Sequence, residues 1–168
     1  MIYLSVYDSP VGEITAASNG KELVGLWFDG QKYYADNIED GKREDDLPIF
    51  LQTKKWLDVY FSGEAPGFTP PIGMNGVSAF RRRVWEIMLT IPYGQTSTYG
   101  RIATQIGNET GKRVSAQAVG GAVGRNRIAI IIPCHRVIGT DGSLTGYAGG
   151  IDKKLKLLTH ERADISLK

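Results

Sequence analysis

A stretch rich in proline and glycine divides the chain of 168 residues into two parts that follow different patterns. Residues 64–76 contain three prolines and three glycines. Such a composition interrupts helices and strands, so it is typical of a linker. We therefore expect two domains, residues 1–74 and residues 75–168, in a chain that is long enough to bury a core.

The first part predicts an antiparallel sheet with one helix. β-branched and aromatic side chains are frequent in residues 2–8, 12–18 and 22–28, and turn residues separate these runs. Residues 31–46 are polar and charged, as in a surface connection. Apolar side chains in residues 47–61 recur at the spacing of an amphipathic helix. The first domain is thus expected to be an α+β support.

The second part predicts helices. Residues 78–90 begin with a serine N-cap and carry a broad apolar face. Residues 98–106 predict a short helix, residues 107–112 a polar turn, and residues 115–124 another helix with a serine N-cap. Two short helices around a glycine-containing turn resemble a helix-turn-helix. The expected fold class is therefore α/β in its α+β form, with a mostly helical C-terminal domain.

The helix predicted after Ser115 is almost bare of side chains. Glycine in a helix costs up to ~1 kcal/mol relative to alanine, so its repeated use here needs a reason. A bare helix can approach another backbone closely, either that of a neighbouring helix or that of a ligand. The small residues are Ala116, Ala118, Gly120, Gly121, Ala122 and Gly124.

The net charge of +2 conceals an uneven distribution. Residues 1–78 carry 6 Lys or Arg against 12 Asp or Glu, whereas residues 79–168 carry 14 against 6, which gives −6 and +8. A basic module suits a polyanion, and an acidic companion is expected to face away from it. An ordinary solvated surface is the alternative, because charge alone does not identify DNA.

Cys134 is the only cysteine of the chain, and it lies in Pro133-Cys134-His135-Arg136 after the apolar residues 128–132. We expect these apolar residues to form a buried strand. A thiol beside an imidazole is a candidate nucleophile, since a neighbouring base can generate the reactive thiolate. The alternative is a buried structural cysteine, which is common in globular proteins.

The composition also bears on the compartment. One cysteine cannot form an internal disulfide, which favours a reducing compartment. The N-terminal residues lack a basic region followed by a long apolar stretch, and no apolar run approaches the ~20 residues of a membrane span. We expect a cytoplasmic protein with no membrane partner, and nothing in the sequence requires more than a monomer.

The residues around Cys134 are part of a long, ordered pattern. In chain order it comprises Ile91-Pro92-Tyr93-Gly94, Thr98-Tyr99, Ile102-Ala103, Ala118-Val119-Gly120, Asn126, Ile132-Pro133-Cys134-His135-Arg136-Val137-Ile138-Gly139, Gly142, Leu144, Gly146-Tyr147-Ala148-Gly149-Gly150, Lys154, Leu157-Leu158 and Glu161. This pattern closely resembles the O6-alkylguanine-DNA alkyltransferases, also called methylated-DNA-protein-cysteine methyltransferases. The resemblance covers roughly residues 78–162, and the preceding part matches only in general character.

The resemblance implies an enzyme that repairs DNA by direct reversal. A methyl or other alkyl group would pass from O6-alkylguanine, and also from O4-alkylthymine, to Cys134. His135, oriented by Glu161, would accept the thiol proton through a water, because neighbouring side chains of an extended segment point to opposite faces. Tyr99 would donate to N3 of the guanine. The S-alkyl product has no carbonyl for water to attack, so the protein would act once.

The resemblance also implies roles for residues around the reacting atoms. Asn126 would tie the predicted helix-turn-helix to the active-site segment. The carbonyls of Cys134 and Val137 and the backbone amide of Ala148 would contact the base, while Tyr147 would form a pocket wall and Lys154 would support the pocket loop. No cofactor is required. A metal site is not expected either, since Cys134, His135 and His160 lack the spacing of a structural zinc site.

Double-stranded DNA that contains O6-alkylguanine is the implied partner. The target atom lies within the stacked duplex, so the base must be flipped out. The resemblance implies docking of the bare helix in the minor groove, which suits a protein that must find damage in any sequence. The residues expected at the DNA are Thr98, Ala116, Gln117, Ala118, Gly120, Gly121, Arg125 and Arg136.

Two positions depart from the family pattern. Gln117 stands where an arginine commonly fills the gap left by the flipped base, and glutamine offers less stacking and no charge. We therefore expect slower or weaker base flipping. Arg127 stands where a proline often follows the asparagine, and either a phosphate contact or simple solvation would account for it.

Three other functions fit parts of the sequence. A DNA-binding protein that senses alkyl lesions without chemistry would not need Cys134, His135 and Glu161 together. A thiol hydrolase using cysteine and histidine would turn over a thioester or peptide, whereas the transferase would lose its thiol stoichiometrically. A helix-turn-helix regulator would need side chains that read base edges, and the bare helix has few.

Overall fold

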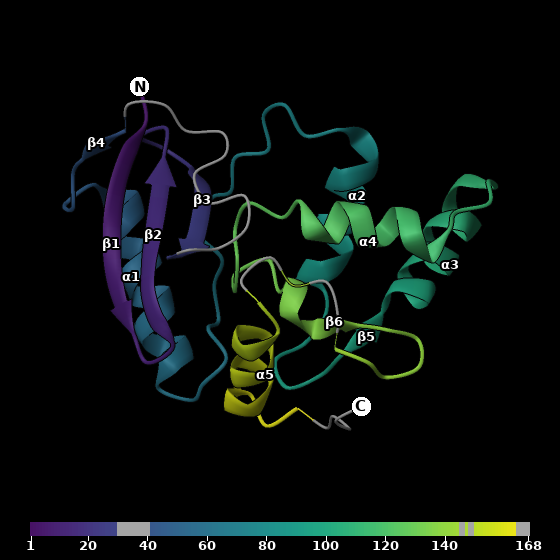
Figure 1. The fold of residues 1–168 in the computed structure, drawn as a ribbon. Coiled ribbons are helices and arrows are strands. Elements are labelled where there is room, and N and C mark those ends of the chain that lie inside the picture. Colours follow the sequence, from purple (N-terminus) through teal and green to yellow (C-terminus); the bar gives the residue numbers. More distant parts are fainter. Residues whose placement is uncertain (30–40, 145–146, 148–149, 164–168) are drawn as a thin grey trace. The chain divides into compact units, whose positions relative to one another are not determined.

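The computed structural model describes residues 1–29, 41–144, 147 and 150–163 (Figure 1). The chain forms two compact units. Unit 1 comprises residues 1–75 and 127–131, and unit 2 comprises residues 76–126 and 132–168. The return of residues 127–131 to unit 1 is not part of the expected division at a single linker.

Unit 1 is built on a four-stranded sheet. Its strands are β1 (Tyr3–Ser9), β2 (Gly12–Ser18), β3 (Leu23–Phe28) and β4 (Lys42–Arg43). Their order is β3-β2-β1-β4, and β2 is antiparallel to both β1 and β3, whereas β4 is parallel to β1. The predicted antiparallel meander is confirmed. The expected surface connection over residues 31–46 lies mostly outside the described residues.

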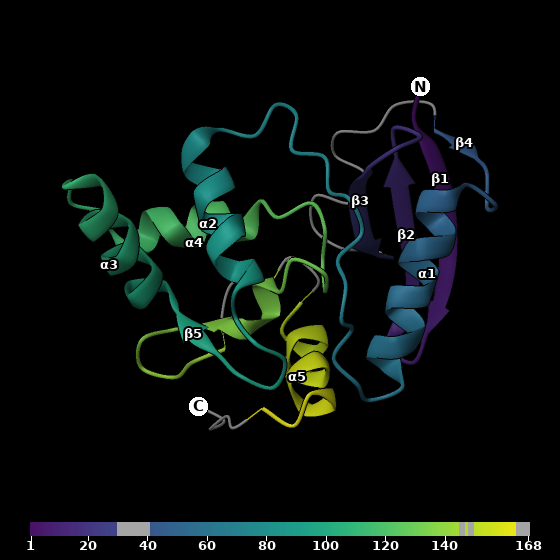
Figure 2. The same cartoon turned by 180° about the vertical axis from the view of Figure 1, so that it is seen from behind.

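Helix α1 (Pro48–Phe61) covers one face of this sheet (Figure 2). Pro48 stands in the first turn, where its missing N–H has no intrahelical partner to lose. Phe50, Leu57 and Tyr60 are fully buried on the face that packs against the strands. The amphipathic helix predicted over residues 47–61 is therefore confirmed, and the core of unit 1 lies between this helix and the sheet.

The outer edge of β3 is occupied by residues 127–131. The Leu26 N–H donates to the Arg127 carbonyl at 2.8 Å, and the Ala129 N–H donates to the Leu26 carbonyl at 3.0 Å. The prediction of a buried strand over residues 128–132 is wrong. Ile128 forms a bridge with Leu26, and the chain then turns at Ile130, whose φ is 68°. These residues are apolar because they are buried, not because they are extended.

Unit 2 contains four α-helices in the described part of the chain, namely α2 (Ala79–Leu89), α3 (Tyr99–Thr110), α4 (Ala116–Gly124) and α5 (Ile151–His160). Hydroxyl oxygens cap three of them. The side chains of Ser78, Thr98 and Ser115 accept from the N–H groups of Arg81, Arg101 and Ala118 at 3.2, 3.0 and 3.0 Å. The helix starts predicted at Ser78 and Ser115 are confirmed, because N-capping is a local property of the sequence.

Helix α3 is one turn longer than predicted. The polar residues after Ile106 were expected to form a turn, but the helix continues to Thr110 and ends at Gly111, which has the left-handed φ of 69°. This is the glycine position at which helices commonly stop. The Arg83 guanidinium on α2 also holds Glu109 on α3 through two contacts of 2.8 and 2.6 Å. This long-range ion pair is not visible in the local pattern.

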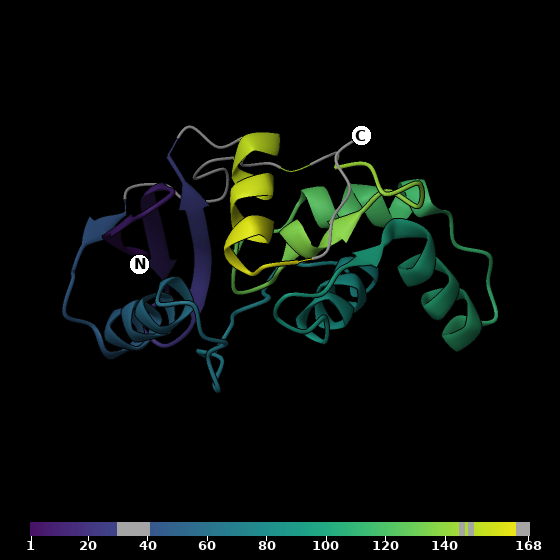
Figure 3. The same cartoon turned by 90° about the horizontal axis from the view of Figure 1, so that it is seen from below.

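Helices α2, α3 and α4 pack together in unit 2, and Figure 3 shows α2 and α3 in teal beside α4 in green. The indole Nε1 of Trp85, on α2, donates to the Ala122 carbonyl of α4 at 2.9 Å. A helix with few side chains is thereby anchored through its backbone. Val119, Ala122 and Val123 form the buried side of α4.

A short parallel pair joins two segments that are distant in the sequence. Strand β5 (Ser97–Thr98) pairs with β6 (Val137–Ile138), and a 3-10 helix, η1 (Cys134–Arg136), directly precedes β6. This pairing brings the start of α3 to the segment that carries Cys134. Among the described residues, no helix is both long and apolar enough to cross a membrane.

Candidate active site around Cys134

Cys134 begins η1 and lies at a sharp backbone turn. Its N–H donates to the Ile132 carbonyl at 2.8 Å around Pro133, which has φ −81° and ψ 65°. These values and the i to i+2 hydrogen bond define an inverse γ-turn. Because the chain turns here, the strand geometry that would place Cys134 and His135 on opposite faces does not apply. The Cys134 residue is 6% exposed.

His135 is paired with a carboxylate from the end of α5. Its Nε2 lies 2.5 Å from Oε2 of Glu161, and both side chains are fully buried. Within the described residues, Nδ1 of His135 is buried without a hydrogen-bond partner. A buried ring nitrogen without a hydrogen-bond partner lowers the stability of the folded protein, so such an atom calls for a functional explanation.

Glu161 is the hub of this cluster. Its Oε1 accepts from the Gly94 N–H at 3.0 Å, and its two oxygens accept from Nε and Nη2 of Arg136 at 2.8 and 3.1 Å. Burial raises the pKa of this carboxyl, but the hydrogen bonds from His135 and Arg136 and the charge of Arg136 outweigh burial and hold the pKa well below its ordinary value. Glu161 is therefore a buried carboxylate ion.

The tautomer of His135 follows from the negative charge of Glu161. Burial lowers the pKa of His135, and the charges of Arg136 and Lys154 act in the same direction, while Glu161 opposes them. The imidazole is thus neutral near pH 7. A carboxylate only accepts hydrogen bonds, so Nε2 carries the ring proton and donates it to Glu161. Nδ1 is left with a lone pair and can act as a base.

The prediction that Arg136 contacts DNA is wrong. Its side chain is 9% exposed, and besides its two bonds to Glu161 its Nη1 donates to the Ile91 carbonyl at 2.7 Å. A guanidinium that is buried and engaged in this way is not available to a phosphate. Arg136 instead fixes the carboxylate that holds His135.

The thiol of Cys134 is protonated at rest. Burial raises its pKa, although Asn126, the charge of Lys154 and Tyr147 lower it in part. Reaction therefore requires that the proton be removed by a base. His135 Nδ1 is the nearby group with the correct protonation state for this task.

Lys154 brings a positive charge into the site. Its side chain is completely buried on α5, and Nζ donates to the Val137 carbonyl at 2.6 Å. Nζ also lies 5.8 Å from the centre of the Tyr99 ring. Burial lowers the pKa of Lys154 to about 8, and a thiolate at Cys134 would oppose this shift. A protonated Lys154 thus stabilises a thiolate at Cys134.

The other predicted residues lie around this cluster. Asn126, just after α4, donates through Nδ2 to the Ile132 carbonyl at 2.9 Å, so it connects α4 with the segment that leads to Cys134. Tyr99 is the first residue of α3, and Thr98 pairs with Ile138 through β5 and β6. Tyr147 is buried. Ala148 lies outside the described residues.

The small residues of α4 are presented on its exposed side. Ala116, Gln117, Ala118, Gly121 and Arg125 are exposed, and Gly120 is half-buried. Packing against another helix therefore does not explain why this side of α4 is bare. A Cβ atom on Gly120 would lie 3.8 Å from Cδ1 of Tyr99. The bare side of α4 therefore lies next to Tyr99, which borders the Cys134 cluster.

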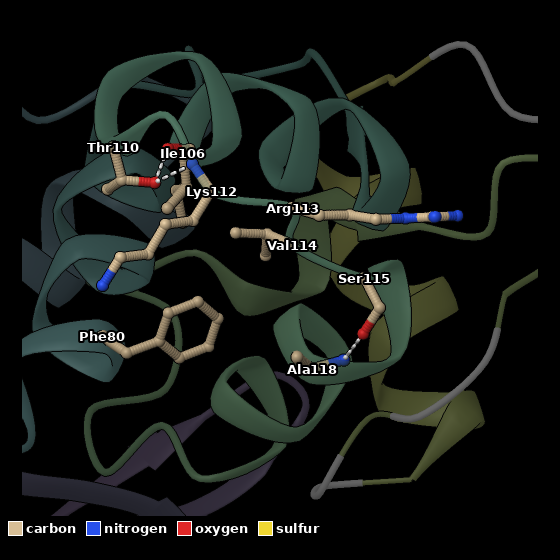
Figure 4. Close-up of a pocket in the computed structure, with 8 residues that line it drawn as sticks. All are labelled: Phe80, Ile106, Thr110, Lys112, Arg113, Val114, Ser115 and Ala118. Carbon is tan, nitrogen blue, oxygen red and sulfur yellow. Dashed lines mark hydrogen bonds between the residues drawn. The ribbon is translucent and has the colours of Figure 1, made fainter.

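A basic turn joins α3 and α4, and sequence reasoning missed it. Lys112 and Arg113 are both exposed there. They border a pocket of about 580 Å³, and none of the residues predicted to be catalytic lines it. Figure 4 shows Lys112 extending along the pocket on the side of Phe80, while Arg113 points away from it. The two adjacent basic residues between the two predicted helices are the feature of the sequence that could have indicated this basic turn.

Comparisons with known proteins agree along the whole chain. Residues 79–163 match the family described as "6-O-methylguanine DNA methyltransferase, DNA binding domain", and residues 2–73 match its "ribonuclease-like domain". A protein from Mycobacterium leprae named methylated-DNA--protein-cysteine methyltransferase is 41% identical over 98% of this chain and 95% of its own. The chain belongs to the 6-O-methylguanine DNA methyltransferase family.

Relatives of this methyltransferase family extend beyond one lineage. A protein of the same name from Haemophilus influenzae is 40% identical over 96% of this chain and 87% of its own. A crystal structure of the Mycobacterium tuberculosis O6-methylguanine methyltransferase aligns with a TM-score of 0.83 at 42% identity, over 96% of this chain and 93% of that chain. Another, of Mycobacterium tuberculosis OGT in complex with DNA, aligns with a TM-score of 0.82 at 42% identity, over 95% and 92%.

The methyltransferase family match includes every described member of the Cys134 cluster, since residues 79–163 run from the start of α2 to just beyond Glu161. In the described part of the chain, no three side chains of the types His, Cys, Asp and Glu gather in a way that could hold a metal ion. The arrangement that remains is a thiol, a neutral imidazole, a carboxylate and a buried ammonium group.

Proposed function

We propose that this protein repairs DNA by direct reversal, transferring a methyl or other alkyl group from O6-alkylguanine, and also from O4-alkylthymine, to Cys134. The observation that carries the proposal is the buried His135–Glu161 pair beside the chain's single thiol, with a basic lone pair left on Nδ1. Membership of the methyltransferase family supports the same reaction. We place the protein in the cytoplasm, because its one cysteine favours a reducing compartment, and as a monomer, because nothing in the sequence requires more.

Deprotonation of the thiol comes first. His135 Nδ1 takes the Cys134 proton through a water molecule, and the imidazolium that forms is stabilised by the carboxylate of Glu161. Arg136 keeps Glu161 ionised and in place. Lys154 stabilises the thiolate. Glu161 and Lys154 thus each lower the free energy of a charge that appears during the reaction and not before it.

Transfer is an in-line displacement at the alkyl carbon. A new bond forms between Cys134 Sγ and that carbon, while the bond from carbon to O6 breaks and its electron pair stays on the guanine. The Tyr99 hydroxyl donates a hydrogen bond to N3 and makes guanine a better leaving group, and the guanine anion takes up, through solvent, the proton that His135 accepted from the thiol. The thioether on Cys134 has no electrophilic carbonyl, hence water does not regenerate the thiol and each molecule reacts once.

Helices α3 and α4 form the helix-turn-helix that docks on double-stranded DNA. The bare side of α4, with Ala116, Gln117, Ala118 and Gly121 exposed, fits the narrow minor groove, where larger side chains would prevent close approach. Gly120 and Arg125 belong to the same helix and its C-cap and extend this surface, and Thr98 at the start of α3 contacts the DNA as well. Lys112 and Arg113 extend it with two cations suited to phosphates. The alkylated base is flipped out of the stack toward Tyr99 and Cys134.

Intact mass spectrometry with peptide mapping tests this function. The protein is incubated with a duplex oligonucleotide that carries one O6-methylguanine, and separately with the undamaged duplex. A gain of one methyl group on Cys134, at most one per protein and only with the lesion, is expected. Cys134→Ser serves as the control and should bind the duplex without modification. Lesion binding by the wild type without modification would indicate a sensor instead.

A further inference from the structure

The turn that follows α2 has a geometry that requires glycine. The Gln95 N–H donates to the Pro92 carbonyl at 3.0 Å, so residues 92–95 form a β-turn. Gly94 has φ 79°, whereas Tyr93 is not among the described non-glycine residues with a positive φ. A positive φ at the third position alone defines a type II turn, in which that position favours glycine.

This turn and the residue before it contact the buried cluster at three points. The Gly94 N–H donates to Oε1 of Glu161 at 3.0 Å. The Ile91 carbonyl accepts from Nη1 of Arg136 at 2.7 Å. The guanidinium carbon of Arg136 also lies 5.8 Å from the centre of the Tyr93 ring, which is within the range of a cation–π contact. The segment therefore holds both members of the ion pair between Arg136 and Glu161. Every one of these residues belongs to unit 2.

The Gly94 amide completes the hydrogen bonding of Glu161. A carboxylate offers about four acceptor positions. Side chains occupy three of them, with Nε2 of His135 as one donor and Nε and Nη2 of Arg136 as the other two. The Gly94 N–H occupies the fourth, and because the Glu161 side chain is fully buried, loss of this donor would leave a buried acceptor unsatisfied.

We propose that the turn after α2 positions the base of the reaction, in that the Gly94 amide fixes the Glu161 carboxylate and, through it, the imidazole of His135. This proposal rests on the proposed function, in which Nδ1 of His135 takes the thiol proton. Gly94 is a positioning residue, because it acts through Glu161. In a type I turn the central peptide is rotated by about 150° relative to type II, which would direct this N–H away from the carboxylate.

A side chain at residue 94 would disturb the arrangement in two ways. Its Cβ atom would lie 3.1 Å from the backbone carbonyl oxygen of Glu161, which is closer than an ordinary van der Waals contact. It would also disfavour the positive φ that the type II turn requires. Gly63 has φ 99°, and a Cβ atom there would meet nothing within 4 Å. Gly63→Ala therefore introduces the backbone strain without the contact, and it is the matched control for Gly94→Ala.

Single-turnover transfer from the O6-methylguanine duplex is measured for both variants well below their unfolding transitions, together with duplex affinity. Gly94→Ala should react about tenfold more slowly with unchanged affinity, because the base is displaced while the DNA surface is not. Gly63→Ala should lower the urea midpoint but react at the wild-type rate. A wild-type rate for Gly94→Ala, or an equal loss of rate in the two variants, would overturn the proposal.

NMR of the His135 ring reports on its position without requiring transfer. The chain has two histidines, so labelling histidine with nitrogen-15 and comparing with His160→Gln assigns the signals. The Nε2 proton of His135 is bonded to a buried carboxylate, and it should resonate far downfield and exchange slowly with solvent. In Gly94→Ala this signal should shift upfield or exchange faster, and in Gly63→Ala it should not change. A folded Gly94→Ala protein with the wild-type signal would contradict the positioning role.

Hydrogen exchange at the Gly94 amide of the wild type needs no variant to fold. This amide lies in a turn, where exchange is ordinarily fast, yet its bond to Glu161 should make it exchange as slowly as the amides of α2. Fast exchange there, with α2 protected, would count against the proposal. Absence of any methyl transfer by the wild type would instead remove the proposed function, while amide exchange and the His135 signal would still report on the turn.

Discussion

At the scale of single residues, the site depends on where one carboxylate is buried. Glu161 accepts from His135, Arg136 and Gly94, and these partners come from two separate segments, η1 and the turn at Gly94. The pairing of His135 with Glu161 matches what the resemblance implied. The burial of Arg136 could not be predicted, because an arginine beside a candidate active site is equally suited to a phosphate until its carboxylate partner is known.

Replacing Glu161 by glutamine should leave Arg136 as a buried charge without its carboxylate partner. Removing one partner of a buried pair costs about 3–5 kcal/mol, so urea unfolding should show a loss of this order. Transfer to Cys134 should also slow by about a hundredfold, as His135 loses the group that stabilises its imidazolium. Glu109→Gln breaks an exposed pair with Arg83 and is the control. An equal effect of both changes on stability would contradict the argument.

Lys154→Met tests the buried ammonium, because methionine has a similar length and no charge. Without that charge, burial raises the pKa of Cys134 further, and transfer should slow about tenfold at pH 7. In the wild type, the help from Lys154 is lost as the pH rises through about 8, where this residue deprotonates. The ratio of wild-type to variant rates should therefore fall between pH 7 and pH 9. A constant ratio across single-turnover measurements would exclude this role.

At the scale of elements, local signals predicted where helices begin, and long-range contacts decided where some of them end. Ser78 and Ser115 are the side-chain N-caps of α2 and α4, and the sequence alone predicted both. The last turn of α3 depends on Gly111 and on the ion pair between Arg83 and Glu109. The apolar residues 128–132 led to the wrong prediction of a strand, because a buried loop requires apolar residues as much as a buried strand does.

Gln117→Arg should accelerate repair. Residue 117 is exposed on α4, so an arginine there can reach the DNA without disturbing the helix. It would stack in the gap left by the flipped base and add a favourable charge, and we expect a several-fold higher single-turnover rate. Gln52→Arg adds the same charge at an exposed position of α1 and should leave the single-turnover rate unchanged. If Gln117→Arg also leaves the rate unchanged, the idea that glutamine slows base flipping fails.

The basic turn between α3 and α4 should contribute to phosphate binding. Each phosphate neutralised adds roughly 0.9 to the slope of log K against log salt. Replacing Lys112 and Arg113 together by glutamine should therefore lower this slope by about 1–2 and weaken binding to damaged and undamaged duplexes alike. Lys55→Gln on α1 is the control. Fluorescence anisotropy between low and moderate salt measures the slope, and an unchanged slope would place the turn away from the DNA.

At the scale of the whole molecule, titration of buried groups couples stability to pH. The pKa of His135 is lowered from 6.5, so on acidification the unfolded chain takes up this proton first and stability begins to fall near that pH. The pKa of Glu161 is lowered from 4.5, so a further loss follows below that pH. Urea midpoints measured from pH 7.5 to pH 4 should decline accordingly. In Glu161→Gln the loss below pH 4.5 should be smaller, and a flat wild-type profile would contradict both shifts.

The architecture could be predicted more fully than the connections within it. The sheet and helix α1 of unit 1 follow from alternation and periodicity, and the cluster around Cys134 follows from the ordered pattern that carries the resemblance. The return of residues 127–131 to β3 leaves no local signature, because it depends on a free strand edge about a hundred residues earlier in the chain. Such pairings are decided by the completed sheet.

This return also changes what the linker can be used for. A cut or a recombination point within residues 64–76 would separate the first seventy or so residues from the segment that covers Leu26 on β3. The freed edge would expose unpaired N–H and carbonyl groups, which invite pairing with other chains. The two units are interleaved along the sequence. If the N-terminal half were exchanged between relatives, residues 127–131 would therefore have to be exchanged with it.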